Sequence, residues 1–384
     1  MAHLTVNDCF YQIRNGANIK QGDADGGYPI TRIETISNDV FNRDRMGYAG
    51  ITDLTKYESY VLEDGDLLMS HINSVQYLGR TVLYEKQGDE KIIHGMNLLG
   101  LKANRSIVKP AFARYAFYSP KFRQQLRRIT KKSVNQASFT VADLKKIEID
   151  VPSLEKQAHI VENLDKTKRI LALRRQEIEV LDALIKARFV ELTTKWNASE
   201  LPLSDFLDDI TYGFTNPMPD SDVGPWKITA KDVVNGHVNF ETARKTTQEA
   251  YDLLTAKSKP IIGDVLLTKD GTLGRTAIVE DEDLCVNQSV AVLRCNERVM
   301  PRFLTLLLQL PEYQTEMTKN SGGGTIKHIY ITKVDKMPVK IPDINAQKDI
   351  ISFVKQVDKS KVAVQKSLDE TQLLFNSLMQ KYFG

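Results

Sequence analysis

The sequence predicts an α+β chain in which two similar mixed α/β domains alternate with two long helices that pair as an antiparallel coiled coil. Three observations predict this fold. Most of the chain is an internal repeat, each copy places short strand-like runs before helical ones, and each copy leads into a long segment with heptad spacing. We expect domains at residues 1–152 and 198–342 and helices within 153–197 and 343–384. Two copies of one scaffold, joined in this way, imply a pseudo-twofold internal repeat.

The repeat is carried by matched apolar positions and turn residues. Residues 109–122 (KPAFARYAFYSPKF) recur with the same length as 300–313 (MPRFLTLLLQLPEY), and 144–157 (LKKIEIDVPSLEKQ) recur as 334–347 (VDKMPVKIPDINAQ). The shorter matches are GDLLMS (65–70) with GDVLLT (263–268), Gly79-Arg80-Thr81 with Gly274-Arg275-Thr276, and Asp8 and Gly16 with Asp205 and Gly213. Many polar residues between these anchors differ. The pattern predicts one scaffold used twice, with each copy recognising something different.

Within each copy, strand-like runs broken by Gly and Pro come first. They lie at 28–36, 79–85 and 96–103 in the first copy and at 225–233, 274–280 and 289–295 in the second. A helix-like run follows beside Pro110 and Pro301, because proline suits the first turn of a helix. A basic or glycine-rich loop comes next, and a strand that ends at Pro152 or Pro342 closes each copy.

The long helices are predicted over 155–194 and 345–383, which contain neither Pro nor Gly. Each would be about 60 Å long at 1.5 Å per residue. Such a helix cannot cover its own apolar stripe, and a folded domain separates the two in sequence, so we expect an antiparallel pair. The alternative is that each helix packs on its own domain. The expected seam consists of Leu164, Leu171, Ile178, Leu181, Ile185, Leu192, Ile350, Val354, Val357, Val364, Leu368, Phe375 and Leu378.

Some apolar residues of these helices lie off the seam, where one helical partner would not cover them. They are Leu173, Leu184, Phe189 and Leu374. Exposed apolar stripes mark interaction sites, so these residues predict a surface for a partner protein. Burial against the chain's own domains is the equally open alternative.

Composition argues against several classes of protein. The chain has 52 Lys and Arg against 49 Asp and Glu, so any nucleic-acid surface must be local. Its three cysteines, Cys9, Cys285 and Cys295, show no CxxC spacing, which argues against a disulfide framework, a zinc site and secretion. The six histidines show no metal-ligand spacing, and we expect no metal. With no signal-peptide pattern and no run of about 18–20 apolar residues, we expect a soluble cytoplasmic protein.

Motifs for catalysis are missing as well. An adenine-N6 methyltransferase needs an [Asp/Asn]-Pro-Pro-aromatic loop to hold a flipped base, and the nearest string, Asn216-Pro217-Met218-Pro219, lacks the aromatic residue. No GxGxxG unit and no GxxxxGK[ST] phosphate loop occurs. We therefore expect that the chain catalyses nothing by itself.

A basic cluster in the first copy predicts contact with DNA. Six basic residues and no acidic one lie between Lys121 and Ser133, and polar side chains follow. Cations hold phosphates, whereas amide side chains can read adenine. A solvated helix face running into a polar loop is the alternative. The candidates here are Arg127, Lys131, Lys132, Ser133, Asn135 and Gln136. The corresponding loop of the second copy, 321–328, has three glycines and supplies Gly323, Thr325, Lys327 and His328; an ordinary hairpin tip is its alternative reading.

Further candidates are expected in loops rather than cores. They are Arg32, His71, Asn73, Gln76, Tyr77 and Arg80 in the first copy and Thr229, Lys231, Lys269, Asp270, Thr272 and Arg275 in the second. A structural role is favoured for Arg80 and Arg275, which stand in the repeated GRT motif. Residues that differ between the copies, such as His71, Asn73, Gln76 and Lys269, are favoured for specificity. Weaker candidates follow the matched Gly16 and Gly213, namely Lys20, Gln21, Thr215 and Asn216.

Two variable domains, each followed by a long helix, resemble the specificity subunit of Type I restriction–modification enzymes over essentially the whole chain. The residues that carry the resemblance best are PWKITAKDV (225–233), GDVLLTKDGTLGRTAIV (263–279), NQSVAVLR (287–294) and ITKVDKMPVKIPDINAQ (331–347). The first copy diverges: its turn SHINSVQYLGRT (70–81) has three extra residues, and Gly95-Met96 replaces Asn287-Gln288.

The resemblance implies two DNA target-recognition domains, each reading one half of a split, asymmetric DNA sequence. It implies that the helices space these domains and dock two methyltransferase subunits, with motor-nuclease subunits completing the restricting complex. No cofactor is then expected in this chain, and S-adenosylmethionine and ATP with Mg²⁺ belong to the partners. Two rival readings remain: a scaffold whose duplicated domains bind proteins, and an enzyme with unfamiliar active-site chemistry.

Overall fold

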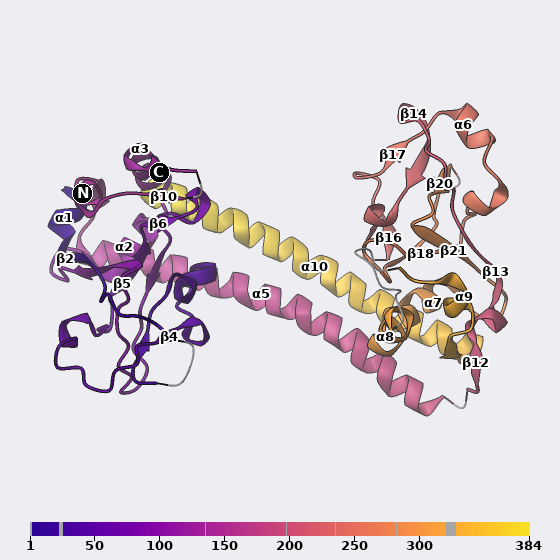
Figure 1. The fold of residues 1–384 in the computed structure, drawn as a ribbon, viewed down its shortest axis with the longest axis horizontal. Coiled ribbons are helices and arrows are strands. Elements are labelled where there is room, and N and C mark those ends of the chain that lie inside the picture. Colours follow the sequence, from indigo (N-terminus) through magenta and orange to yellow (C-terminus); the bar gives the residue numbers. More distant parts are fainter. Residues whose placement is uncertain are drawn as a thin grey trace. The chain divides into compact units, whose positions relative to one another are not determined.

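The computed structural model describes residues 2–22, 26–134, 136–196, 198–234, 236–281, 283–319 and 328–384. The chain divides into two compact units. Unit 1 comprises residues 1–175 and 366–384, and unit 2 comprises residues 176–365. Each unit contains a mixed α/β domain together with part of both long helices (Figure 1).

Both units are built on a four-stranded antiparallel sheet with the same strand order. In unit 1 the order is β2 (Phe10–Asn15), β8 (Leu98–Ala103), β5 (Leu67–Ser70) and β7 (Thr81–Leu83). In unit 2 it is β13 (Leu207–Tyr212), β21 (Val290–Cys295), β18 (Val265–Thr268) and β19 (Thr276–Ile278). The register shifts in both edge strands, between Phe10 and Gln12 and between Leu207 and Asp209. The sequence repeat is therefore a repeat of the fold.

Two short helices follow each sheet, where the sequence predicted one helical run. They are α2 (Pro110–Ala116) and α3 (Pro120–Ile129) in unit 1, and α7 (Pro301–Leu308) and α8 (Pro311–Thr318) in unit 2. The expectation of one run was wrong because a second proline lies ten residues after the first in each copy. Proline breaks a helix interior but suits a first turn, so each proline starts a helix of its own.

A terminal two-stranded sheet closes each domain. In unit 1, β1 (Ala2–Thr5) pairs antiparallel with β11 (Glu148–Val151), which follows α4 (Val141–Leu144). In unit 2, β12 (Glu200–Pro202) pairs with β22 (Pro338–Lys340), which follows α9 (Ile331–Asp335). The strands expected over 28–36 and 225–233 end early, and 3-10 turns occupy Ile33–Asp39 and Ala230–Asp232.

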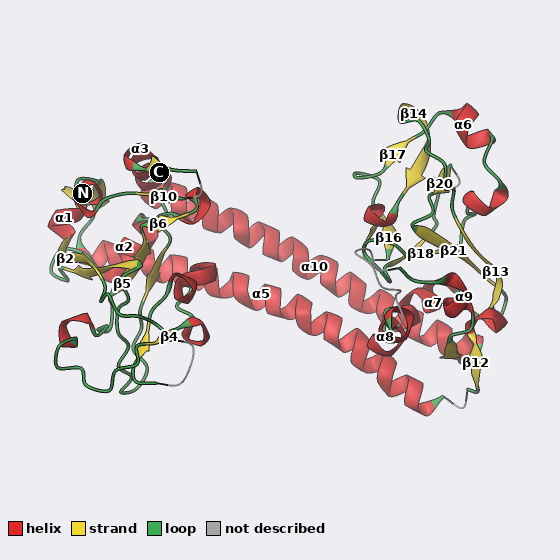
Figure 2. Ribbon diagram, in the orientation of Figure 1, coloured by secondary structure: helices red, strands yellow, loops and turns green. Residues whose placement is uncertain are grey.

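Further helices and strands complete the two domains. They are α1 (Val6–Cys9), β3 (Pro29–Ile30), β4 (Gly47–Tyr48), β6 (Ile72–Asn73), β9 (Lys131–Lys132), β10 (Ala137–Ser138), β14 (Ser221–Ile228), β15 (Val233–Val234), β16 (His237–Val238), β17 (Arg244–Lys245), α6 (Gln248–Asp252) and β20 (Leu284–Val286) (Figure 2).

The long helices are α5 (Leu154–Lys195) and α10 (Ile344–Phe383), and they run antiparallel in both units. In unit 1, Asn163 near the start of α5 donates to the Tyr382 hydroxyl near the end of α10, at 3.2 Å. In unit 2, Lys361 donates to Asp182 at 2.5 Å. The predicted fold class, with two mixed domains and an antiparallel helix pair, is confirmed. Each predicted seam residue is buried or half-buried, and Leu164, Leu171, Ile350, Val354, Val357 and Val364 are the most deeply covered.

A buried glutamine ties the start of each long helix to its domain. Gln157 accepts a hydrogen bond from the Lys109 backbone N–H at 2.8 Å and donates to the carbonyls of Ile107 and Pro152 at 2.9 and 2.8 Å. Its side chain is fully buried. Because the amide has both a donor and an acceptor side, it can pair with a backbone N–H and two carbonyls at once.

Gln347 makes the same three contacts in unit 2. It accepts from the Met300 N–H and donates to the carbonyls of Arg298 and Pro342, all at 2.8 Å. This glutamine is also fully buried. The repeat thus includes individual hydrogen bonds as well as apolar positions. It shows that Gln157 of α5 and Gln347 of α10 occupy equivalent positions.

Aromatic rings join the long helices to the cores. In unit 1, Phe383 of α10 lies 5.3 Å from Phe112 of α2, measured between ring centroids. In unit 2, Phe189 of α5 lies 5.4 Å from Phe303 of α7. All three cysteines are free, and Cys9 and Cys285 are buried. No helix among the described residues is long and apolar enough to cross a membrane.

Candidate nucleic-acid interface

The candidate residues gather where strands of the central sheets end. In unit 1, Ser70 at the end of β5 pairs with Leu98 at the start of β8. In unit 2, Thr268 at the end of β18 pairs with Val290 at the start of β21. We call this side of each sheet the loop edge. The strands β2 and β13 end at the same edge, because Asn15 pairs with Leu99 and Tyr212 pairs with Ala291.

In unit 2 the loop edge brings together four residues from three distant parts of the sequence, namely Tyr212, Lys269, Asp270 and His328. The Lys269 amine lies 3.0 Å from a carboxylate oxygen of Asp270 and 5.3 Å from the centre of the Tyr212 ring. The other Asp270 oxygen contacts Nδ1 of His328. Lys269 is only 6% exposed, so the expectation of a free loop lysine was wrong. Lys269 directly follows the buried strand β18, and its side chain contacts Asp270 and the Tyr212 ring.

Thr229 and Lys231 lie beside this cluster. The Thr229 hydroxyl donates to Asp232 at 2.7 Å and so stabilises the following 3-10 turn. Ser289 connects this turn to Lys269, because the Ser289 hydroxyl accepts from the Ala230 N–H at 3.0 Å and its carbonyl accepts from the Lys269 N–H at 2.9 Å. Lys231 is exposed. Thr229 is therefore a structural residue that presents Lys231.

Thr268 shapes the GRT turn of unit 2. Its hydroxyl donates to the Thr272 carbonyl at 2.5 Å and accepts from the Arg275 backbone N–H at 2.9 Å. Thr272 is left exposed, whereas Arg275 is half-buried. Thr215 and Asn216 are exposed as well, just after Phe214, whose carbonyl accepts from the Gln288 N–H at 2.8 Å.

In unit 1 the loop edge carries a small three-stranded sheet. Its register places Asn73 of β6 beside Ala137 of β10, and Ala137 beside Lys132 of β9. Lys131 and Lys132 are both exposed, and so are Ser133 and Gln136 in the turn that follows. The register thus places Asn73 and Lys132 in one row of the sheet, whereas Lys131 lies in the next row with Ile72 and Ser138, so its side chain points to the opposite face.

The GRT turn of unit 1 packs against the basic helix α3. Arg123 donates to the Leu78 carbonyl at 2.7 Å, which holds the turn against α3. The Arg80 guanidinium lies 4.6 Å from the Tyr77 ring centre and pairs with Asp39 at 3.1 Å, which fits the structural role favoured for it. Gln76 and Arg127 remain exposed on this surface.

Other predicted residues of unit 1 are occupied by their own domain. Arg32 donates to the Gln21 side chain at 2.9 Å and to the Gly22 carbonyl at 2.8 Å, whereas Lys20 is exposed. His71 is only 6% exposed and packs edge-on against Phe139, and burial lowers its pKa. The expectation that His71 lies in an open loop was wrong, because its ring completes the core beneath the loop edge.

Asn135, Gly323, Thr325 and Lys327 lie outside the described residues.

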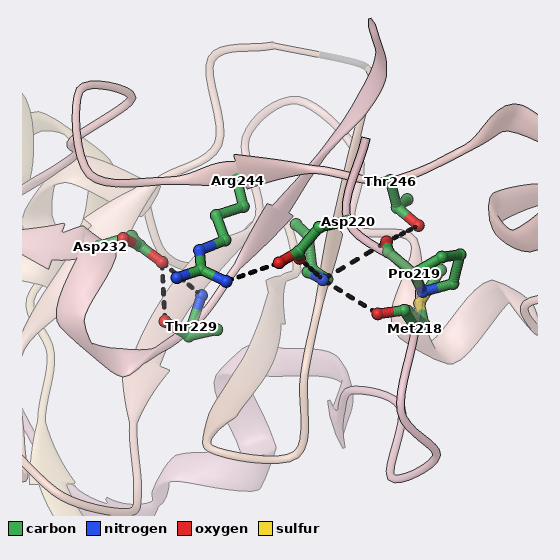
Figure 3. A network of polar contacts seen from close by, with 8 residues as sticks. Met218, Pro219, Asp220, Thr229, Asp232, Arg244 and Thr246 are labelled. Atoms are coloured by element: carbon green, nitrogen blue, oxygen red, sulfur yellow. Dashed lines mark hydrogen bonds and ion pairs between the residues drawn. The ribbon is translucent and has the colours of Figure 1, made fainter. Parts of the chain in front are cut away.

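The sequence reading missed one polar network in unit 2. The Asp220 carboxylate accepts from Lys227 and from Arg244, each at 2.5 Å (Figure 3). These bonds lower the pKa of Asp220, and the bond from Lys227 has the larger effect. A cavity of about 620 Å³ adjoins this network and is lined by Asp220, Ser221, Asp222, Trp226, Ala243, Arg244 and Lys245. The sequence signals that could have indicated this site are an aromatic residue next to a basic one, Trp226-Lys227, and two adjacent basic residues, Arg244-Lys245.

Among the residues that the structure describes, no three His, Cys, Asp or Glu side chains are grouped as metal ligands. The exposed candidates at the loop edges are cations, amides and hydroxyls, which bind phosphates and base edges.

The comparison with known proteins also points to DNA recognition. The model of the family described as Type I restriction modification DNA specificity domain matches residues 7–183 and 220–371.

The chain belongs to the Type I restriction–modification DNA specificity family. A putative type I restriction enzyme MjaX specificity subunit from Methanocaldococcus jannaschii is 26% identical over 374 residues, covering 92% of this chain and 85% of the relative. The EcoBI specificity subunit of Escherichia coli is 29% identical over 174 residues, covering 44% of this chain and 36% of the relative.

Solved structures of specificity subunits share the fold. A chain from a structural study of the assembly and conformational transition of a type I restriction–modification system matches with a TM-score of 0.65 at 18% identity, covering 100% of this chain and 97% of that one. The specificity subunit from M. genitalium matches with a TM-score of 0.53 at 12% identity, covering 100% of this chain and 96% of that one.

Proposed function

We propose that this specificity subunit recognises a bipartite, asymmetric DNA site and directs adenine-N6 methyltransferase and restriction subunits to it. The observation that carries the proposal is a repeated sheet with different side chains at its two loop edges. Unit 1 presents Asn73, Gln76 and Lys132, and unit 2 presents Lys231 and Thr272. One scaffold with two different reading surfaces fits a DNA site whose halves differ. Residues 1–152 and 198–342 are the proposed recognition domains.

The proposed DNA contacts are of two kinds. Contacts to phosphates position the protein on the DNA, and contacts to base edges read the sequence. Arg127, Lys131 and Lys132 are exposed cations of unit 1, suited to bind phosphates. The amides of Asn73 and Gln76 can pair with the N6 and N7 positions of adenine in the major groove. In unit 2, Lys231 is the proposed phosphate contact and Thr272 the proposed base contact. The Lys269–Asp270–His328 cluster is held together by its own ion pairs.

We further propose that the helix pair sets the gap between the half-sites. Both helices run without interruption, over Leu154–Lys195 and Ile344–Phe383. Because a helix has a fixed rise per residue, a paired helix of constant length suits a spacer. A site with half-sites at varying separations would not need such an element.

Partner subunits supply the chemistry in this proposal. S-adenosylmethionine binds on the methyltransferases and ATP with Mg²⁺ on the motor-nuclease subunits, while this cytoplasmic chain binds no cofactor. The helices retain exposed apolar residues for docking, namely Leu173 at 54%, Leu184 at 45% and Leu374 at 53% exposed. Phe189 was wrongly assigned to that surface. It is 2% exposed because it packs on Phe303 of its own domain.

Selection from a randomised duplex library tests the proposal. The reconstituted complex of this chain with its methyltransferase partner should enrich two different half-sites at one constant separation. Its affinity should fall steeply with salt, because phosphate contacts release counterions. Enrichment of no DNA motif, together with stable binding of another protein by the two domains, would favour the rival reading of a protein-binding scaffold.

A further inference from the structure

The loop edge of unit 1 concentrates the exposed apolar side chains of its domain. Outside the two long helices, seven large apolar residues are exposed among the described residues of unit 1, and five of them lie at the loop edge. Exposed apolar residues that stand singly are normal on any protein surface, whereas a concentration of them marks an interaction surface. The five are Ile72, Val75, Tyr77, Met96 and Val134, and the other two are Tyr11 and Val40.

Three segments that are far apart in sequence supply these five residues. The turn between β5 and β7 contributes three of them, the turn between β9 and β10 contributes Val134, and Met96 precedes β8. Strand β6 of the first turn pairs with β10, so these two turns lie side by side (Figure 1). The Met96 N–H donates to the Ala17 carbonyl at 3.1 Å, just after β2. The fold therefore brings the five residues to one edge of the domain.

The small three-stranded sheet turns one of its faces to solvent. Ala137 of β10 is buried in the core, so the face that carries its side chain is covered at the centre. Ile72, Ser138 and Lys131 form the next row and point to the opposite face, where Ile72 is 40% exposed. The outward face thus sets an aliphatic side chain, a hydroxyl and a cation in one row.

The turn between β5 and β7 also sets an aliphatic side chain next to an amide. This turn has three more residues than its counterpart in unit 2, and it forms a 3-10 turn over Val75–Tyr77. Val75 is 53% exposed, and the adjacent Gln76 is exposed as well. The longer turn of unit 1 therefore presents an apolar group and an amide at neighbouring positions.

The described residues of unit 2 place their exposed apolar side chains differently. Near its loop edge these are Tyr212 and Tyr330, whose ring centres lie 5.3 Å from the Lys269 amine and 4.9 Å from the His328 ring centre. Exposed aliphatic residues of this domain lie in β14, after α6 and before β18, namely Val223, Leu253, Ile261 and Ile262. An aliphatic loop edge is thus one way in which the two recognition surfaces differ.

Aliphatic side chains beside amides and cations match one kind of base pair in double-stranded DNA. The 5-methyl group of thymine is the apolar group that a base edge presents in the major groove. Adenine of the same base pair presents N6 and N7, which suit an amide. Cations on the same domain, such as Lys131 and Arg127, suit the flanking phosphates. This combination favours an A·T base pair over an apolar protein surface as the occupant.

We propose that unit 1 recognises thymine through apolar contacts of Ile72 and Val75 with the 5-methyl group in the major groove. Gln76, beside Val75, pairs with the adenine opposite the thymine that Val75 contacts. The inference rests on the proposed function, because it names base pairs that unit 1 reads. It requires at least one A·T pair in the half-site of unit 1.

Deoxyuridine substitution tests the contact from the DNA side. Deoxyuridine pairs as thymine does but lacks the 5-methyl group, so each thymine of the site obtained by selection can be replaced singly. The affinity of the reconstituted complex, measured by fluorescence anisotropy of a labelled duplex, should fall about fourfold at a thymine that faces Ile72 or Val75. A loss of this size corresponds to one buried methyl or methylene group.

Matched serine variants assign each loss to a residue. Val75→Ser should abolish the deoxyuridine effect at one thymine and Ile72→Ser at another, because serine offers a hydroxyl in place of the aliphatic group. Both positions are exposed, so neither change removes a core contact. Val223→Ser is the control, because Val223 is 75% exposed in β14 of unit 2. It should retain every deoxyuridine effect of the unaltered chain.

The outcomes separate this inference from the proposed function. Selected half-sites in which no deoxyuridine weakens binding would overturn the thymine contacts and leave the proposed function standing. Equal deoxyuridine losses in the unaltered chain and in both serine variants would also overturn them, because other residues would then contact the methyl groups. Weaker binding of the methyltransferase partner by these variants, with an unchanged DNA preference, would show that the edge docks a protein instead. Absence of any sequence-specific DNA binding by the complex would overturn both.

Discussion

Replacing the buried glutamine of either unit should lower that unit's stability measurably. The Gln347→Leu substitution conserves approximate volume but removes three hydrogen bonds, to the backbone of Arg298, Met300 and Pro342. A hydrogen bond contributes about 1 kcal/mol on average, and an unsatisfied buried group costs about 1–3 kcal/mol. The expected loss is therefore about 3 kcal/mol. For a domain of about 150–250 residues this corresponds to a fall in Tm of about 6–12 °C.

Tryptophan fluorescence assigns the effect to one unit. The chain has two tryptophans, Trp196 and Trp226, and both lie in unit 2. Gln347→Leu should shift the urea transition seen by fluorescence to lower urea concentrations. Gln157→Leu should shift the transition seen by circular dichroism while leaving the fluorescence transition nearly unchanged.

The control is Gln356→Leu, which changes an exposed glutamine of the same helix. Such surface substitutions usually change stability by less than about 0.5 kcal/mol. If Gln347→Leu unfolded at the same urea concentration as this control, the glutamine would not anchor α10. A shift of the fluorescence transition in Gln157→Leu equal to that in Gln347→Leu would refute the assignment of one glutamine to one unit.

Three further outcomes follow from the same contacts. Burial lowers the pKa of His94 from 6.5 to about 4, so the unfolded chain binds more protons between these values. The stability of unit 1 should then fall as pH drops from about 6.5 to about 4, by up to about 1.4 kcal/mol per pH unit, and His94→Gln should flatten that dependence in urea titrations followed by circular dichroism. The double variant Lys131→Ala and Lys132→Ala should reduce the salt dependence of DNA binding by the reconstituted complex, lowering the log–log slope by about 2, whereas Lys348→Ala should leave the slope unchanged. Inserting one heptad into both α5 and α10 should lengthen the gap of the selected DNA motif by about 10 Å, or about three base pairs, with both half-sites retained; an unchanged gap would show that the helices are not the spacer.

The long helices could be predicted closely because their signal is long and uninterrupted. Expected over 155–194 and 345–383, they occupy Leu154–Lys195 and Ile344–Phe383. Dozens of residues with one apolar period and no Pro or Gly leave little freedom in placing a helix. The short strands gave weaker signals. Within 28–36 only Pro29–Ile30 forms a strand, and residues 33–36 belong to a 3-10 turn that hydrogen bonds of the Thr35 hydroxyl stabilise.

The sequence could assign the candidate residues to loops but could not predict which of them are exposed. The sequence placed the candidate residues in loops rather than cores, and it did not show that several of these loops meet where strands of the central sheets end. Whether such a residue is exposed depends on what packs over it, and sequence spacing contains no such information. His71 is covered by Phe139, a contact between residues far apart in sequence. Lys269 is held by Asp270 and Tyr212 for the same reason.

Long-read methylation profiling of the source genome, with and without this gene, tests the central claim most directly. We predict that removing the gene abolishes N6-methyladenine on a split motif with two different half-sites and a constant gap. Restoring the gene should restore the mark, and a chain carrying the heptad insertion in both helices should move it to a motif with a longer gap. An unchanged methylome in cells whose methyltransferase partner is expressed and active would contradict the claim that this chain selects the modified sequence.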